Sequence, residues 1–415
     1  MIVNIVEALC GCGKSHAMIE KIRKDPSQNY MWVTPFLDEA GDDDSGNVGR
    51  VRTQAPELCF QTPSAKHKNR KLGDLARLLS QGENVSITHN LFLNITEEML
   101  VYIKQYDYII IIDEVIDKVD IHTKVLDRVD DIKGLIDTGI IEVTEKGQLK
   151  WVGIVLNAFK EEYDLCEKGM LYFYNNRLLI KRYNSRVYEL AQDVYVLTYM
   201  FQSSPMRVWF DANDIEWQYH YLPLRTTTPE RKAAIRSLVY IEPLEKWIED
   251  VNDTSLSSFS STWFKSKEAE RLSQDMIATA NKLYRRWYKR HNEAPKIMFT
   301  TFKDHIDKVA GKGCKRINYS EAESNFVAKN SRATNNHADK DCLIYWVNVY
   351  PHVDIKNYLD SLVDKGKGLD SDKFALSEMI QWVFRSALRE EERIYLFVAS
   401  RRMRELFLEW LENDW

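Results

Sequence analysis

Short runs of apolar, often β-branched residues recur along the first half of the chain, separated by longer amphipathic or polar stretches. These runs cover residues 2–6, 31–35, 84–88, 108–112 and 194–198. Apolar runs of this length without polar alternation are typical of strands buried on both faces, as in a parallel sheet covered by crossover helices. The pattern therefore predicts an α/β lobe built on a parallel sheet.

The same pattern returns in the second half of the chain. Strand-like runs occupy residues 296–301, 324–328, 342–347 and 393–398. A last helix is predicted to begin after Ser400, because serine is a favourable residue at a helix N-cap. We therefore predict two α/β lobes, residues 1–225 and residues 226–415.

Two segments interrupt this regular pattern. Residues 118–193 are longer than a simple crossover and contain two hairpin-like stretches, which predicts a small inserted subdomain of winged-helix-like character. Residues 222–262 are richer in proline, threonine and serine, and we interpret them as the linker zone between the lobes.

The octet Ala-Leu-Cys-Gly-Cys-Gly-Lys-Ser at residues 8–15 follows the first apolar run and precedes a helix-like stretch. A strand, a loop of small residues, Lys-Ser and a helix form the layout of a phosphate-binding P-loop. The residues predicted to hold the phosphates are Cys10, Gly11, Cys12, Gly13, Lys14 and Ser15. Lys14 would reach the β- and γ-phosphates and Ser15 would bind Mg²⁺. The alternative is an ordinary turn before a helix.

An apolar run of four isoleucines ends in Asp113 and Glu114. Carboxylates at the carboxyl end of a parallel strand lie at the sheet edge where ligands bind. Asp113 is predicted to ligate Mg²⁺ and Glu114 to orient the attacking water. The alternative is a core strand that happens to end in a solvated acidic turn.

Gln381, Arg385 and Arg389 are spaced by four residues, which on a continuous helix would place them on one face. A helix that aims two guanidinium groups at a phosphate can neutralise charge developing on a transferred γ-phosphoryl group. The alternative is a surface face that forms ion pairs with residues 390–392.

Composition narrows the choice of partners and compartment. The 415 residues are 44% hydrophobic and 29% charged, and the formal net charge of −5 argues against a protein that generally coats nucleic acid. No apolar stretch approaches about 18 residues, so we predict no membrane association. Outside the predicted phosphate loop the cysteines show no paired metal-ligand spacing, and a disulfide between Cys10 and Cys12 would distort that loop. We expect no signal peptide, because the first strand is predicted to begin at residue 2. These features predict that the protein resides in a reducing cytoplasm.

A basic helix is predicted around residues 276–290. Its polar face carries Lys282, Arg285, Arg286, Lys289 and Arg290, whereas its other face is apolar. A solvated face is favoured over a direct track for nucleic-acid phosphates.

Taken in order, the motifs resemble those of superfamily-two helicases, the relatives of the DEAD/DEAH-box proteins, and are most similar to compact bacteriophage-type members. The segments that carry the resemblance are residues 8–15, Thr34-Pro35, Thr88-His89, Asp113-Glu114, Leu197-Thr198, residues 300–303, residues 330–335 and Gln381-x₃-Arg385-x₃-Arg389. Two features depart from the family pattern. Ile116 stands where the family box has Asp or His, and Arg389 lies one residue later than usual.

The resemblance implies two RecA-like P-loop NTPase lobes with parallel sheets, and ATP with Mg²⁺ as cofactors. It implies an ATP hydrolase that moves along or unwinds DNA, with hydrolysis at the interface of the two lobes, and replication or recombination proteins as partners. The catalytic residues implied are Glu114, Gln381, Arg385 and Arg389, and those that contact nucleic acid are Thr34, Thr88, Thr300 and Arg332. Two alternatives stay open: a nucleic-acid-stimulated ATPase that switches or remodels without unwinding, and a P-loop kinase or small-molecule NTPase.

Overall fold

The structure of the protein is a computed structural model that describes residues 2–42, 44–66, 70–123, 125–224, 229–314, 325–329 and 336–413. Internal contacts divide the chain into two compact units. The first contains Met1–Glu7, Lys14–Leu222 and His352–Leu369, and the second contains Ala8–Gly13, Pro223–Pro351 and Asp370–Trp415. Each unit is α/β and is built on a parallel sheet, as predicted for two RecA-like lobes.

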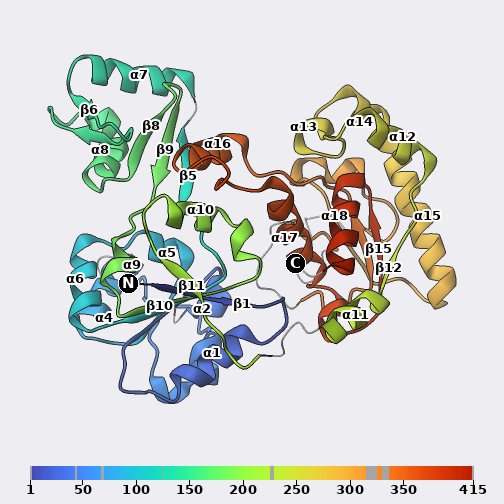
Figure 1. Ribbon diagram of the computed structural model, residues 1–415, viewed down its shortest axis with the longest axis horizontal. Coiled ribbons are helices and arrows are strands. Elements are labelled where there is room, and N and C mark those ends of the chain that lie inside the picture. The colour runs from blue at the N-terminus through green and yellow to red at the C-terminus, as the bar shows by residue number, and fades with distance from the viewer. Residues whose placement is uncertain are drawn as a thin grey trace. The chain divides into compact units, whose positions relative to one another are not determined.

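The first unit centres on a six-stranded, wholly parallel sheet in the order β11-β1-β10-β4-β2-β3 (Figure 1). Its strands are β1 Val3–Glu7, β2 Tyr30–Thr34, β3 Val85–Thr88, β4 Ile109–Asp113, β10 Asp193–Thr198 and β11 Trp217–Tyr219. The five predicted strands are confirmed. The sequence missed β11, because three residues of mixed polarity carry no strand pattern.

A core of buried apolar side chains joins the strands of this sheet to several of the helices that flank it. They are α1 Lys14–Ile22, α2 Leu37–Ala40, α3 Arg50–Gln54, α4 Arg70–Ser80, α5 His89–Leu93, α6 Glu97–Gln105, α9 Arg186–Leu190, α10 Pro205–Asp211 and α16 Val353–Ser361. The strand register aligns the carboxyl ends at one edge: Glu7 lies beside Thr198, Leu197 beside Asp113, and Thr34 beside Thr88. This edge is where the predicted phosphate chemistry would take place.

The inserted subdomain has both predicted hairpins and its own apolar core. Its elements are β5 Val119–Thr123, α7 Leu126–Asp137, β6 Ile141–Val143, β7 Leu149–Trp151, α8 Lys160–Glu167, β8 Leu171–Tyr174 and β9 Leu178–Arg182. Strand β9 pairs with β8 and β5 in an antiparallel sheet, and β6 pairs with β7.

Helix α16 comes from the second half of the chain but packs within the first unit, beside α10 and β5 (Figure 1). The Tyr358 ring lies edge-on to Tyr174, and an ion pair joins Arg177 to Asp354 at 2.7 Å. Arg207 Nη2 donates a 2.8 Å hydrogen bond to the carbonyl oxygen of Gly368, seven residues after the end of this helix. A single boundary near residue 225 therefore does not describe the units, although the chain does enter the second unit at Pro223.

The second unit contains a four-stranded parallel sheet in the order β12-β15-β14-β13. Its elements are α11 Pro229–Leu238, β12 Val239–Ile241, α12 Lys246–Thr254, α13 Ser261–Phe264, α14 Lys267–Arg271, α15 Ser273–His291, β13 Ile297–Thr300, β14 Cys342–Tyr345, α17 Ser371–Val383, β15 Ile394–Val398 and α18 Arg401–Glu412. Ser400 caps α18 by accepting a hydrogen bond from the Met403 N–H, as predicted.

Two expectations for this unit are wrong. Residues 222–262 are not a linker zone, since β12 pairs with β15 and the α12 residues Ile248 and Val251 enter the core. The predicted strand at 324–328 begins outside the described residues, and its described part makes only an isolated bridge, from Phe326 to Phe299.

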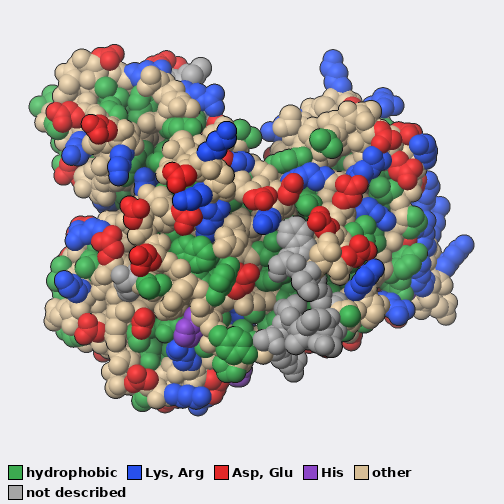
Figure 2. All heavy atoms as spheres, viewed as in Figure 1, with side chains coloured by type: hydrophobic (Ala, Val, Ile, Leu, Met, Phe, Trp, Pro, Cys, Tyr) green, Lys and Arg blue, Asp and Glu red, His purple; other side chains and the backbone are tan. Residues whose placement is uncertain are grey.

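The predicted basic helix is confirmed as α15, whose residues Met276, Ala280, Leu283 and Trp287 are buried. Figure 2 shows blue Lys and Arg side chains along this helix at the right-hand edge. Much of the charge is paired. Lys282 forms an ion pair with Glu245, and Glu242 accepts hydrogen bonds from two arginines of the helix. The exposed Lys282–Glu245 pair fits a solvated face, whereas Glu242 is buried beneath the two arginines.

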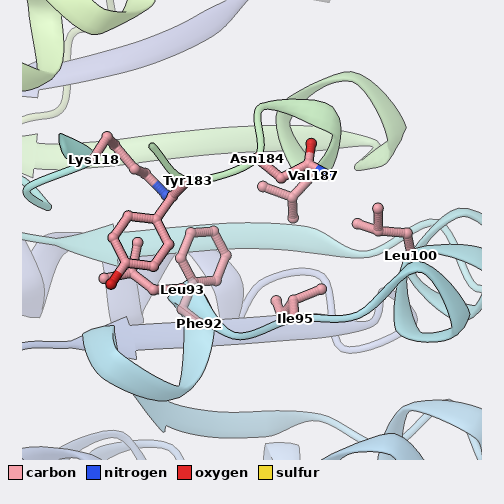
Figure 3. Close-up of a pocket in the computed structure, with 8 residues that line it drawn as sticks. All are labelled: Phe92, Leu93, Ile95, Leu100, Lys118, Tyr183, Asn184 and Val187. Carbon is pink, nitrogen blue, oxygen red and sulfur yellow. The ribbon is translucent and has the colours of Figure 1, made fainter. Parts of the chain in front are cut away.

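A buried lysine lies at the junction between the first sheet and the inserted subdomain. The Lys118 ammonium group lies 4.6 Å from the ring centre of Phe92, 5.0 Å from Tyr188 and 5.6 Å from Trp209. Lys118 and Phe92 line a cavity of about 20 Å³, roughly the space of one water molecule (Figure 3). Burial lowers the pKa of Lys118 to about 7. Cation–π contacts with the aromatic faces favour the charged ammonium form, but the loss of hydration on burial disfavours it more strongly, so the pKa falls.

This lysine gives a pH prediction. In the unfolded chain the amine keeps its proton up to about pH 10.4, whereas in the folded chain it keeps the proton only up to about pH 7. The destabilisation caused by burying the charged amine is therefore fully present below about pH 7 and disappears as the pH rises towards 10. Lys118→Met should therefore stabilise the protein more at pH 7 than at pH 10, by about 2–4 kcal/mol in the free energy of unfolding. Denaturant titrations at both pH values measure this difference. The exposed Lys104→Met is the matched control, and an equal gain at both pH values for Lys118→Met contradicts the prediction.

Candidate nucleotide site

The loop between β1 and α1 has the backbone of a glycine-dependent turn. Gly11 and Gly13 have φ angles of +78° and +82°, a region that residues with a Cβ rarely adopt. Helix α1 begins at Lys14, directly after the second glycine, so its first N–H groups face the loop. This local geometry suits an anion at the helix N-terminus.

Ser15 and Asp113 lie together although 98 residues separate them. The Ser15 hydroxyl donates a 2.9 Å hydrogen bond to Asp113 Oδ2. Asp113 is buried, and burial together with the charges of Glu114 and Glu39 raises its pKa to about 7, against opposing effects of Arg50 and Ser15. A buried carboxylate beside other acids is an environment that a divalent cation would stabilise. The two side chains predicted to hold Mg²⁺ are thus neighbours.

Three further polar side chains complete this corner of the site. Arg50 Nη1 lies 3.6 Å from Asp113 Oδ2 and 3.7 Å from Glu39 Oε1. The Thr34 hydroxyl donates a 3.0 Å hydrogen bond to Glu39 Oε2. Sequence reasoning missed Glu39 and Arg50, because they lie on the short helices α2 and α3 at no spacing characteristic of a motif.

Glu114 follows β4 in a strained backbone conformation. Its φ of +67° is unusual for a residue with a side chain and costs on the order of 1 kcal/mol. The Glu114 N–H donates a 2.9 Å hydrogen bond to the Leu197 carbonyl, which holds this turn. A backbone hydrogen bond therefore links the acidic motif to the Leu197-Thr198 segment. Ile116, the departure from the family box, is buried in the core instead.

Lys14 is buried near the end of β1. Glu7, the last residue of that strand, accepts a 3.0 Å hydrogen bond from the Phe201 N–H. Burial raises the pKa of Glu7, while the Phe201 and Met200 N–H groups and the Lys14 charge oppose that rise. The lysine predicted to reach the phosphates therefore lies within electrostatic reach of one carboxylate of its own unit.

Of the residues predicted to contact nucleic acid, the three that the structure describes are engaged in hydrogen bonds or buried. Thr34 is fully buried and bonded to Glu39. Thr88 caps α5 by accepting a 3.3 Å hydrogen bond from the Leu91 N–H. Thr300 is fully buried at the carboxyl end of β13, and its hydroxyl has no hydrogen-bond partner among the described residues. Arg332 lies outside the described residues. Their contact with nucleic acid stays a prediction.

The prediction that Gln381, Arg385 and Arg389 share one helical face is wrong. Helix α17 ends at Val383, and Arg389 belongs to the separate 3₁₀ helix Ala387–Glu390. The turn is stabilised by contacts outside α17, because the Ala387 N–H donates a 2.9 Å hydrogen bond to the Lys340 carbonyl. Gln381 remains on α17, where its Nε2 donates to the Ser377 hydroxyl at 3.2 Å.

The two arginines have different surroundings. Arg385 is buried near His337, whose pKa is lowered by burial and, more weakly, by Lys340 and Arg385. Arg389 lies against the glycine loop, since a Cβ added at Gly11 would stand only 3.3 Å from Arg389 Cγ.

A second cation contacts the same loop. Arg231 Nη1 donates a 2.8 Å hydrogen bond to Cys12 Sγ. Sequence reasoning missed Arg231, which lies 219 residues from Cys12 and in no motif. Two guanidinium-bearing side chains, Arg231 and Arg389, therefore contact the loop predicted to bind phosphates.

Fold and site together define an α/β protein with two parallel-sheet units, one of which brings a serine hydroxyl and a buried aspartate into hydrogen-bond contact. Among the described residues, no helix is long and apolar enough to cross a membrane.

Comparison with known proteins finds similarity in sequence and in structure. Residues 233–411 match the family model of the YonV C-terminal Rossmann-like domain. The chain is 26% identical to the SPbeta prophage-derived uncharacterized protein YonV of Bacillus subtilis (strain 168), over 99% of each chain. The solved structure of S. tokodaii Xpd4 is 14% identical and aligns with a TM-score of 0.48, covering 98% of this chain and 94% of that one.

Proposed function

We propose that this protein is an ATP-dependent helicase or translocase that hydrolyses ATP and moves along or unwinds nucleic acid, with DNA as the favoured substrate. The observation that carries the proposal is the 2.9 Å hydrogen bond from Ser15 to Asp113 at the carboxyl edge of the first sheet. These are the side chains that hold Mg²⁺ in P-loop NTPases. Asp113 also lies within electrostatic reach of the acids Glu114 and Glu39, an arrangement that a divalent cation would stabilise.

Each site residue has a role in this proposal. The N–H groups of residues 10–13 and of the α1 N-terminus bind the phosphates, and Lys14 reaches the β- and γ-oxygens. Ser15 and Asp113 hold Mg²⁺, which would supply charge neutralisation on the phosphates. Glu114 orients the attacking water, and Arg389, with Arg385 and Gln381, stabilises charge on the transferred γ-phosphoryl group.

The partners follow from the same proposal. In this proposal Thr88 and Arg332 contact nucleic-acid phosphates, whereas Thr34 and Thr300 are fully buried and would first have to become exposed. Replication or recombination proteins are the expected protein partners. Similarity to a prophage-derived protein fits a bacteriophage setting. All six cysteines are free, which fits work in a reducing host cytoplasm.

The two other functions are distinguished by one assay. We expect the Mg²⁺-dependent ATPase rate of the full chain to rise several-fold with single-stranded DNA, and a labelled strand to be displaced from a forked duplex. Duplex DNA and RNA are measured in parallel to define the preferred nucleic acid. Stimulation without strand displacement or translocation would support the switch or remodeller instead. No stimulation by any nucleic acid would contradict the proposal and favour a kinase or small-molecule NTPase.

A further inference from the structure

A cluster of three possible metal ligands lies in the second unit, at the amino end of its sheet. It consists of His291, the last residue of α15, with Asp341 and Cys342 at the start of β14. One ligand atom from each residue lies within 4.8 Å of the other two, and His291 Nδ1 is 3.4 Å from Asp341 Oδ2. We propose that these three side chains bind a divalent transition-metal ion, best satisfied by Zn²⁺, with water as the fourth ligand.

The donor atoms and their spacing favour this ion. Imidazole nitrogen, carboxylate oxygen and thiolate sulfur are the ligand types that Zn²⁺ combines in proteins, at about 2.0–2.3 Å. Such bond lengths place neighbouring ligand atoms roughly 3.3–3.7 Å apart in a tetrahedron. The His291–Asp341 separation is already in this range. Small side-chain rotations would bring the Cys342 sulfur into the same shell.

Unpaired polar atoms support a ligand at this place. His291 Nε2 and Asp341 Oδ1 are both buried, and neither has a hydrogen-bond partner among the described residues. Buried polar atoms are rarely left unsatisfied, because each loses its bonds to water. An ion pair between the two side chains uses only their other atoms, so it leaves this deficit in place. An ion held by His291 Nδ1 and Asp341 Oδ2 leaves Nε2 and Oδ1 outside its ligand set, so these two atoms are satisfied by water that enters with the metal. The fourth-ligand water can donate a hydrogen bond to Asp341 Oδ1.

The surrounding charge also favours a cation. His291 lies at the C-terminus of the 19-residue helix α15, where the helix dipole is negative. The neighbouring Arg290 charge also reaches Cys342, but it is paired with the fully buried Glu242, to which Arg290 donates a 3.0 Å hydrogen bond. Cys342 is fully buried, whereas the other two ligands are partly exposed and leave a path for water. Binding would release the thiol proton to solvent and leave a thiolate ligand.

The role that follows is structural and independent of the proposed ATPase. The ion would join the end of α15 to the start of β14, 50 residues later in the chain. Thr300 and Tyr345, which mark the carboxyl edge of the sheet, lie at the opposite ends of their strands. The metal would therefore stabilise the second unit rather than take part in phosphate chemistry.

Cobalt substitution tests the proposal directly. The full chain, stripped of metal with a chelator, is titrated with Co²⁺ and its absorption is recorded. We expect a thiolate-to-cobalt charge-transfer band that saturates at about one ion per chain and is lost in Cys342→Ser. Cys166→Ser, which removes a buried cysteine of the inserted subdomain, is the matched control and should keep the band.

Zinc affinity provides the second readout. His291→Gln should weaken Zn²⁺ binding by at least about tenfold in competition with a chromophoric chelator, and Zn²⁺ should raise the melting temperature of the wild-type chain only. If Cys342→Ser does not fold, the wild-type cobalt spectrum and His291→Gln decide the matter. Absence of a thiolate–cobalt band in the folded wild-type chain would overturn the proposal, as would a band and affinity unchanged in His291→Gln.

Discussion

Glu114→Gln should stop ATP turnover without weakening ATP binding. The amide keeps the size of the side chain but cannot orient and activate the attacking water as a carboxylate does, so we expect kcat to fall about 10²–10⁴-fold. The strained turn should survive, because it rests on the backbone bond to Leu197 and not on the side chain. Steady-state ATPase assays and a fluorescent-nucleotide titration measure the two quantities separately.

Two matched variants define this result. Lys14→Ala should lose nucleotide binding as well as turnover, since its ammonium group is the charge that reaches the phosphates. The exposed Asp117→Asn, three residues after Glu114, should change neither. Wild-type turnover in Glu114→Gln or in Lys14→Ala would contradict the assignment of the site.

Arg389→Ala should reduce the rate of hydrolysis by about 10³–10⁵-fold, the range known for arginines that stabilise phosphoryl transfer. Its stem lies against Gly11 of the loop that we propose binds the phosphates, which is why we expect its guanidinium group to act on charge that develops there. ATP affinity should change little, because such an arginine acts mainly on the transition state. Single-turnover hydrolysis at saturating ATP is the measurement.

Arg393→Ala and Arg385→Ala make this prediction specific. Arg393 is exposed and close in sequence, so its removal should leave the rate unchanged. Arg385 is buried, so Arg385→Ala should lower the melting temperature as well as the rate. A rate in Arg389→Ala within a few-fold of wild type would show that the contact with Gly11 is structural only.

Much of the architecture could be predicted because it is encoded locally. The strands of the first sheet are runs of apolar residues that suit burial on both faces, and α15 carries an apolar stripe that its environment buries as expected. The short strands β11 and β12 could not be predicted in this way. Each has three residues and is held in place by one neighbouring strand rather than by its own pattern.

The end of α17 shows the limit of periodicity. Residues 381–389 contain no glycine or proline to stop a helix, so their spacing predicted a continuous face. The chain leaves the helix after Val383, where Ala387 bonds to Lys340 and Ser386 bonds back to the Val383 carbonyl. These hydrogen bonds compete with continuation of the helix, and the sequence does not reveal this competition because Lys340 lies more than 40 residues away.

The sequence by itself determined the glycine turn after β1 and the acidic motif after β4. Gly11 and Gly13 permit positive φ angles wherever they stand, and a strand of isoleucines delivers Asp113 to the edge of a sheet. Tertiary structure alone decided which distant side chains joined them. Arg50 and Glu39 reach Asp113, Arg231 reaches Cys12, and His291 reaches Asp341 because the fold brings them together. Local backbone preferences act within a few residues, whereas charge pairing and metal ligation depend on distance in space.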